Sequence, residues 1–428
     1  MSNQPPVRIA VLGAGPIGLE TALYARYLGY KVELLQRGES VAANVLEWGH
    51  VPLFSPFGMN ISPLGVAAIQ MQDPGWNCPA PDSTLNGAEY RRRYLLRLSE
   101  LDLMAGVLQL NTEVVAVGRD GWLKHEGVGD PCRANTSLHI LCRHHDGLER
   151  VHNADVVIDC TGTYGNHNWL GQSGIPATGE AAAAEYIEYG LPEVTGRDKD
   201  RYLGRHMLVI GAGYSAATVV TQLSQLADDR PNEDTRVTWI TRQAGDKLPI
   251  PRIPNDRLPN RDALALEANK LAIASEGPVS HYGGVNVSAV QYRPASEDFN
   301  VTLTGERSGV FVFDRIIANV GNRPDNRIYT ELQVHECFAS GGPMKLAAQL
   351  AAQTSANAAV DCLDQTSCGP ESLLNPEPNF YILGSKSYGR GAQFLLSIGF
   401  EQIRDLFTIV GGREDLDLYS TMPQLCSE

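Results

Sequence analysis

The feature that most constrains this chain is a glycine-rich turn, set between a short apolar strand and a helical pattern, that occurs twice. The first copy spans residues 13–18, Gly-Ala-Gly-Pro-Ile-Gly, and the second spans 211–216, Gly-Ala-Gly-Tyr-Ser-Ala. The flanking patterns predict strands at 7–12, 31–35, 206–210 and 236–241, and helices at 19–28 and 217–226. Strand, turn, helix and strand in this order form the unit of a doubly wound parallel α/β sheet.

Each turn has the residues that a phosphate-binding loop needs. The first glycine makes the tight bend, the second lets a pyrophosphate approach the backbone, and the third lets the helix pack closely on the strand. The second copy has alanine in the third position, which the pattern allows. The helix N-terminus offers amide donors and partial positive charge to phosphates. A simple tight turn is the alternative, but the strand before and the helix after favour two dinucleotide sites.

The residue at the end of the next strand indicates which nucleotide each loop binds. A carboxylate there usually binds the ribose hydroxyls, but the first copy has Gln36 followed by Arg37. A glutamine amide can still hydrogen-bond a hydroxyl, more weakly than an ionised acid does. In the second copy the strand ends at Arg242, with Lys247 nearby. Arginine suits the 2′-phosphate of NADP, so we expect NADPH rather than NADH, with a solvated arginine as the alternative.

Two further strands that end in glycine, at 155–162 and 314–321, complete the two units, and each follows a hairpin pattern. The order predicts one domain inserted into another. The fold class is α/β, with two Rossmann-like three-layer dinucleotide-binding domains. We expect the first domain at 1–165 and 322–428, the second at 200–321, and a crossover linker at 166–199.

Composition excludes several function classes. The formal net charge is −14, so no basic surface for nucleic acid is expected. No apolar segment reaches membrane-spanning length and the start of the chain has no cationic patch, so we expect a cytoplasmic protein. The eight cysteines include no C-x-x-C pair, and no motif indicates a metal site. Cys160 lies in an apolar strand and is expected to be a buried structural thiol.

On these motifs, together with the late stretch 379–384, the chain resembles the two-dinucleotide-binding-domain flavoproteins, over nearly its whole length. They include the thioredoxin-reductase-like enzymes and the flavin-containing monooxygenases. The resemblance implies FAD on the first loop and NAD(P)H on the inserted domain, with a helix at 392–407 covering the flavin. The residues then expected to contact FAD are Gly13, Gly15, Pro16, Ile17, Gly18, Gln36, Arg37, Val114, Val115, Thr161, Gly162, Gly384 and Gln393. Those expected to contact NADPH are Gly211, Gly213, Tyr214, Ser215, Ala216 and Arg242.

Three departures separate the chain from both named subgroups. The late strand normally ends in Gly-Asp, but here the pair is Gly384-Ser385. The monooxygenase fingerprint F-x-G-x-x-x-H before the second loop is absent. No redox cysteine pair is present, and neither glycine loop contains a cysteine. The resemblance therefore implies the cofactors more strongly than it implies the reaction.

The segment after the late strand contains Lys386, Tyr388 and Arg390, which are candidates to anchor a substrate anion or tune the flavin; a turn with solvated side chains is the alternative. We expect an FAD-dependent NADPH oxidoreductase acting on a small molecule or oxygen. One alternative is a flavin-dependent monooxygenase that hydroxylates a small molecule. Another is a non-catalytic nucleotide sensor or assembly flavoprotein. A homodimer is possible, and the physical substrate is not encoded in any readable motif.

Overall fold

The computed structural model describes residues 7–244, 247–356 and 362–423, without the side chains of 354–356 and 362. It divides into two compact units. One contains the chain up to Asn166 and again from Arg323 onward, and the other spans His167–Asn322. Each unit is described separately below.

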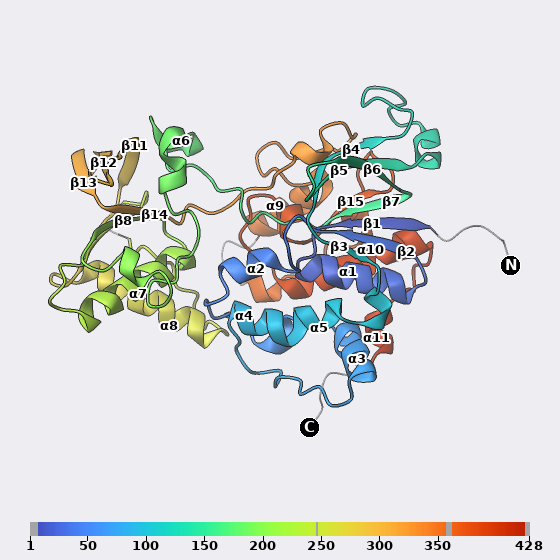
Figure 1. Ribbon diagram of the computed structural model, residues 1–428, viewed down its shortest axis with the longest axis horizontal. Helices are drawn as coiled ribbons and strands as arrows, with labels where there is room; N and C mark the ends of the chain where they lie inside the picture. Colours follow the sequence, from blue (N-terminus) through green and yellow to red (C-terminus); the bar gives the residue numbers. More distant parts are fainter. Residues whose placement is uncertain (1–6, 245–246, 357–361, 424–428) are drawn as a thin grey trace. The chain divides into compact units, whose positions relative to one another are not determined.

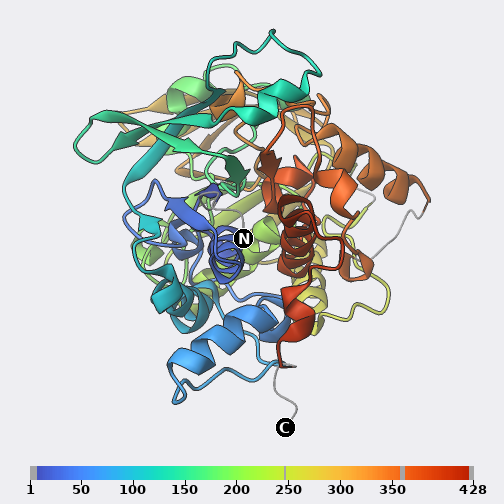
Figure 2. The same ribbon diagram turned by 90° about the vertical axis from the view of Figure 1, so that its right-hand side faces the viewer.

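The first unit is built on a five-stranded parallel sheet in the order β15-β7-β1-β2-β3. Its strands are β1 Arg8–Leu12, β2 Lys31–Leu35, β3 Leu108–Gln109, β7 Val156–Asp159 and β15 Phe380–Ile382. On one face lie α1 Pro16–Tyr27, α3 Pro63–Gln72, α4 Gly87–Tyr90, α5 Leu96–Ser99 and α10 Leu396–Gly411 (Figure 1). Helices α1 and α10 lie side by side (Figure 2), with Tyr24 stacked on Phe407 at 4.9 Å between ring centroids. These contacts form one large apolar core.

An antiparallel sheet covers the opposite face of that parallel sheet. It consists of β4 Thr112–Arg119, β5 Leu138–His144 and β6 Glu149–Ala154. Leu12, Leu35 and Ile140 belong to the apolar core that joins the two sheets. The alternating burial of β5 follows from this arrangement, because successive side chains of a strand point to opposite faces. The first unit therefore has three layers, as expected from the sequence.

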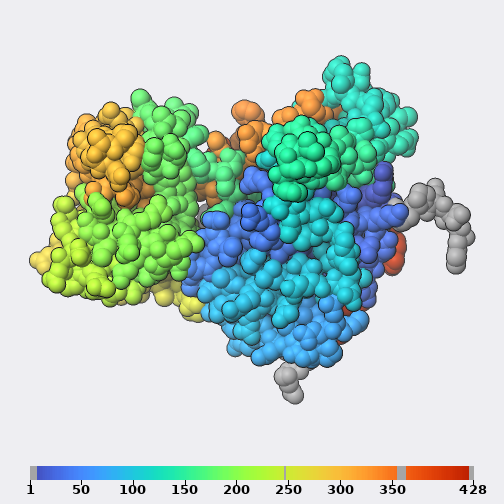
Figure 3. Space-filling model, in the orientation of Figure 1, coloured from blue at the N-terminus to red at the C-terminus, as the bar shows by residue number. Residues whose placement is uncertain are grey.

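A buried ionic cluster anchors the long loop between β4 and β5, which projects at the surface (Figure 3). Glu377 accepts from Arg119 at 2.9 Å and from Arg133 at 2.7 Å, and all three side chains are almost fully buried. Arg133 also donates to the carbonyls of Leu123 and Glu126. Removing one member of such a cluster leaves an uncompensated buried charge, so it fixes this loop on the domain.

The second unit repeats the plan with a four-stranded parallel sheet in the order β10-β9-β8-β14. Its strands are β8 His206–Ile210, β9 Arg236–Ile240, β10 Val279–Tyr282 and β14 Arg315–Ala318. Helices α7 Tyr214–Asp229 and α8 Pro259–Ile273 cover one face. The antiparallel strands β11 Val285–Arg293, β12 Asp298–Gly305 and β13 Gly309–Phe313 cover the other. The predicted fold class, with two Rossmann-like units and one inserted in the other, is confirmed.

Two expectations differ from the structure. The segment 166–199, expected as a linker, packs into the second unit, where Leu170, Ala177 and Ile187 are buried in its core. The late helix begins at Leu396 rather than at 392, because Leu395 is extended and Phe394 packs against Tyr388. Tertiary packing here overrides the helical pattern of the sequence.

Candidate nucleotide-binding sites

The first glycine turn has the geometry of a phosphate-binding loop. Gly13 has φ +92°, and a Cβ there would lie 3.0 Å from the carbonyl oxygen of Cys160. A Cβ on Gly18 would lie 1.8 Å from the Gly13 oxygen, so only glycine lets α1 approach the loop. A Cβ on Gly15 would meet nothing within 4 Å. The backbone at the second glycine therefore faces open space, beside the unpaired amides of the first turn of α1.

A cavity of about 500 Å³ opens beside this turn within the first unit. Its volume is in the usual range for a small-molecule or cofactor site. Seven residues that the sequence assigns to FAD line it, namely Gly13, Gln36, Arg37, Val114, Val115, Thr161 and Gly162. Sequence reasoning missed other lining residues, among them Asn44, Arg143, Tyr164 and Arg327. They come from helices, a strand and a loop that are far apart in the chain, and no local motif marks them.

The cavity lining contains three arginines with different surroundings. Arg327 pairs with Asp325 through two hydrogen bonds, of 2.6 and 2.8 Å. Arg143 pairs with Glu113 and Glu149. Arg37 is exposed on the lining and has no ion-pair partner among the residues that the structure describes. It is therefore the cation best placed to meet an anionic ligand.

Gln36 lines the cavity but already uses its carbonyl oxygen. Oε1 accepts from the backbone amide of Ala14 at 2.9 Å. The side-chain NH₂ group is left to donate to a ligand. A carboxylate in this position would accept from ribose hydroxyls, whereas this amide donates to them. The contact of Gln36 with a ribose stays a prediction, in which the side-chain NH₂ group donates and the ribose hydroxyl accepts.

The late strand ends beside the same cavity. Gly384 has φ +72°, and its amide donates to Gln402 Oε1 at 2.9 Å. Ser385 is half-buried, and its Oγ lies 3.4 Å from where a Cβ on Gly162 would stand. This hydroxyl makes no side-chain hydrogen bond with a described residue. It is available to a ligand at the position where the resemblance implies a carboxylate.

The structure corrects the substrate-anchoring role expected for Lys386. Its ammonium group is 1% exposed and lies 2.6 Å from Asp159 Oδ2. It also donates to Thr161 Oγ1 at 3.0 Å. Lys386 therefore links the ends of β15 and β7 internally and presents no charge to a substrate. A lysine is almost never this buried unless it is paired.

The other candidates after the late strand do not line the cavity. Tyr388 is buried against Phe394, and burial raises the pKa of its hydroxyl to about 12, so it stays neutral. Arg390 is exposed, and its backbone amide donates to Ser340. Gln393 is exposed ahead of α10 and accepts from Gln365 at 3.2 Å. None of the three is among the residues that line this cavity, and the contact of Gln393 with FAD stays a prediction.

Cys160 is a buried thiol beside α1, as expected. It lies 3.8 Å from Thr21 Oγ1, and burial raises the pKa of the thiol far above its usual range. None of the described cysteines Cys78, Cys132, Cys142, Cys160, Cys337 and Cys368 forms a disulfide. A thiol that stays protonated is a poor nucleophile, so Cys160 is not suited to redox exchange.

The second glycine turn has the same geometry as the first. Gly211 has φ +138°, and a Cβ there would lie 2.3 Å from the carbonyl oxygen of Asn319. Gly213 again faces open space, and the buried Ala216 fits because its Cβ lies 3.5 Å from that position on Gly211. Helix α7 begins at Tyr214 and Ser215, so the amide donors of its first turn lie next to the glycine turn.

Arg242 follows the end of β9, exposed and without an ion-pair partner among the described residues. Lys247 is also exposed. A guanidinium here is free to bind a phosphate.

Comparison with solved structures identifies the fold. Bacillithiol disulfide reductase from Bacillus cereus has a TM-score of 0.64 at 17% identity, covering 96% of this chain and 100% of that one. Ornithine N-hydroxylase from Kutzneria sp. 744, solved with reduced FAD, NADP⁺ and L-ornithine, has a TM-score of 0.62 at 14% identity, covering 96% and 100%. Thioredoxin reductase from T. acidophilum has a TM-score of 0.57 at 15% identity, covering 95% and 99%. No protein-family model and no curated protein matches the sequence.

These likenesses extend over nearly the whole chain and confirm the predicted fold. This chain is similar in fold both to disulfide reductases and to an N-hydroxylase. Among the described residues, no helix is long and apolar enough to cross a membrane. Sequence identities this low support a shared fold and do not identify the reaction, which depends on the residues of the site.

Proposed function

We propose that this chain is an FAD-dependent NADPH oxidoreductase that acts on a small molecule or on oxygen. The observation that carries the proposal is the cavity of about 500 Å³ beside the first glycine turn. Seven residues expected to contact FAD line it, and the chain has the fold of enzymes that include an FAD- and NADP⁺-bound hydroxylase. When bound, FAD would supply the two-electron acceptor for a hydride from NADPH.

The residues of the first unit fit the adenosine diphosphate part of FAD. Gly15 leaves room for the pyrophosphate, and the N-terminus of α1 offers amide donors to it. Gln36 and Arg37 would meet the ribose side. Gly384, Ser385 and the residues before α10 would lie along the ribityl chain.

In the second unit the corresponding roles fall on the turn at Gly211 and on Arg242. Gly213 leaves the space for the pyrophosphate of NADPH. Arg242 would pair with the 2′-phosphate, which NADH lacks. These assignments predict a preference for NADPH over NADH.

The electron acceptor is better sought among small molecules and oxygen than among disulfides. The described cysteines form no pair, and the thiol nearest the first loop, Cys160, is buried with a raised pKa. A thiol relay to a disulfide substrate therefore lacks its reactive group in this region. A flavin-dependent monooxygenase is the second candidate, and the similarity of fold to an ornithine N-hydroxylase favours it.

The decisive experiment is spectroscopic. The purified protein, supplemented with FAD and desalted, should retain flavin absorbance, and NADPH should bleach it without oxygen. A protein that binds no FAD would overturn the proposal. A protein that binds FAD but is not reduced by either nicotinamide cofactor would favour a non-catalytic nucleotide-binding role.

Adding oxygen to the NADPH-reduced protein separates the two catalytic readings. Immediate stoichiometric hydrogen peroxide, with no oxygenated product from a panel of amines and other small molecules, would count against a monooxygenase. Product formation coupled to NADPH consumption would count against a simple reductase. The panel should include free amines, because the hydroxylase of similar fold was solved with L-ornithine.

A further inference from the structure

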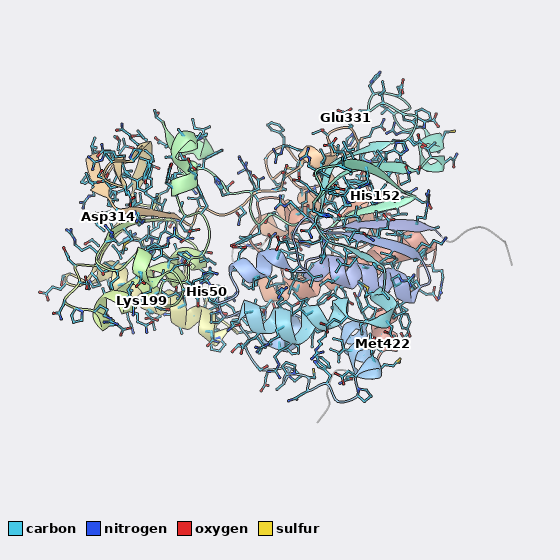
Figure 4. All side chains as sticks on the ribbon, in the orientation of Figure 1. His50, His152, Lys199, Asp314, Glu331 and Met422 are labelled. Atoms are coloured by element: carbon cyan, nitrogen blue, oxygen red, sulfur yellow. The ribbon has the colours of Figure 1, made fainter. Side chains whose placement is uncertain are left out.

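Two histidines of the first unit lie close together on the strands β5 and β6 of the antiparallel sheet. His144 ends β5, and His152 lies in β6 (Figure 4). Their Nε2 atoms are 3.4 Å apart, with the ring centroids at 5.6 Å. Both side chains are half-buried. The pair lies outside the cavity described above.

The contact of His152 Nδ1 with Glu33 determines which nitrogen of the His152 ring carries the hydrogen. Its Nδ1 lies 2.9 Å from Glu33 Oε2 on β2. An ionised carboxylate only accepts hydrogen bonds, so Nδ1 donates and carries the hydrogen. In the neutral ring Nε2 therefore presents a lone pair to His144.

The contact of His144 Nδ1 with Thr112 assigns the hydrogen of the His144 ring in the same way. Thr112 Oγ1 donates its hydrogen to the carbonyl oxygen of Leu110 at 3.0 Å. The hydroxyl must then accept from His144 Nδ1, which lies 3.4 Å away. His144 Nε2 is left with a lone pair as well. Two lone pairs thus face each other, an arrangement that a cation between them would relieve.

We propose that His144 and His152 bind a divalent transition-metal ion, with Zn²⁺ as the best match to their geometry. Two imidazole nitrogens on a tetrahedral zinc ion, each at about 2.0–2.1 Å, lie about 3.3–3.4 Å apart. Neutral imidazole is a preferred ligand of such ions. The carboxylate of Glu33 behind His152 is the partner that metal-bound histidines usually have.

The alternative cation is a proton shared by the two rings. Such a proton would form one hydrogen bond between the two Nε2 atoms, which lie 3.4 Å apart, and would compete with Zn²⁺ for the pair. Burial, Arg150, and the neighbouring histidines His152 and His145 lower the pKa of His144, whereas Asp146 raises it. Arg150 is itself paired with Asp146 at 2.8 Å, which reduces its repulsion of a metal ion.

The site would have two protein ligands and water. No His, Cys, Asp or Glu of the described chain joins the pair in a group of three that could hold a metal. Bound there, the ion would hold the β5–β6 hairpin against β2 through Glu33. It would also fix His144, and hence the side chain of Thr112, which lines the cavity.

Calorimetric titration with ZnCl₂ tests this on the full chain, stripped with a chelator and free of any histidine tag. The wild type should bind one equivalent, and H144A and H152A should each weaken binding at least about tenfold. E33A should weaken zinc binding by roughly tenfold, because His152 loses the carboxylate that accepts from its Nδ1. H145A changes an exposed neighbouring histidine outside the pair and should bind as the wild type does.

Thermal unfolding supplies a second readout, because an ion that binds only the folded state raises the melting temperature. Zn²⁺ should raise it for the wild type and H145A but not for the double variant H144Q/H152Q, which keeps polar side chains in case alanine disturbs the fold. The proposal is overturned if the wild type binds no more zinc than the double variant. It is also overturned if H145A loses binding as completely as H144A.

Discussion

Replacing Lys386 with methionine should destabilise the first unit strongly, because the change leaves Asp159 as a buried charge without its cation. The ammonium lies 2.6 Å from Asp159 Oδ2, and both side chains are at most 1% exposed. Breaking a buried pair on one side costs about 3–5 kcal/mol. Asp159 Oδ1 keeps the amide and hydroxyl of Thr161, at 3.0 and 2.6 Å, so we expect the lower part of that range.

The double variant K386M/D159L separates charge burial from shape. Replacing both members by apolar residues of similar size is often neutral or stabilising, so the double variant should recover most of the loss. The free energies of unfolding come from urea titrations, with hydrogen exchange of β7 and β15 peptides assigning the transition to the first unit. A single variant within about 1 kcal/mol of the wild type would refute the reasoning. So would a double variant less stable than K386M.

Four other predictions follow from the same geometry. R242A should weaken NADPH binding much more than NADH binding, measured by the dissociation constants of both; equal losses would show that the guanidinium does not contact the 2′-phosphate. G18A should fail to fold, since its Cβ would lie 1.8 Å from a carbonyl oxygen. G15A should fold, as judged by circular dichroism, but bind FAD less tightly; the reverse order would contradict the loop assignment. Q36E should bind FAD roughly five- to tenfold more tightly, because an ionised acceptor adds about 1 kcal/mol over a neutral one; unchanged affinity would remove Gln36 from the site. Burial raises the pKa of Glu20 to about 7. The folded state therefore holds this proton more tightly than the unfolded state does, and the free energy of unfolding falls as pH rises from about 4.5 to 7. E20Q should be more stable than the wild type by about 3 kcal/mol at pH 8 and by little at pH 5, and an equal difference at both pH values would argue against a raised pKa.

The parts of the structure that the sequence predicted are those with a local signal. Gly18 is required by a contact within the turn itself, because a Cβ there would lie 1.8 Å from the Gly13 oxygen, and so the six residues 13–18 are enough to recognise the turn. The strands at 206–210 and 31–35 match the structure residue for residue. Their neighbours in the sheet follow from the rules for parallel α/β connections.

The parts that could not be predicted depend on partners far away in the chain. Lys386 sits in a glycine-rich segment that reads as a solvated turn, and its partner Asp159 is 227 residues earlier. Arg133 is buried in a polar loop only because Glu377 reaches it from a distant segment. The segment 166–199 lacks a periodic apolar pattern, yet its scattered apolar residues fill the second core. Composition alone could not distinguish such a segment from a linker.

Under the proposed function, two residues set how firmly FAD would be held. The resemblance implies carboxylates where this chain has Gln36 and Ser385, and the two side chains are placed differently in the structure. The side-chain oxygen of Gln36 accepts a hydrogen bond from the Ala14 amide, so only its NH₂ group is left for a ligand, whereas the hydroxyl of Ser385 is available to a ligand. If each replacement gives up about 1 kcal/mol of charge-assisted hydrogen bonding, affinity for FAD falls roughly 30-fold. Flavin lost during purification would then return on adding FAD, so a colourless preparation tests the proposal only after reconstitution has been tried.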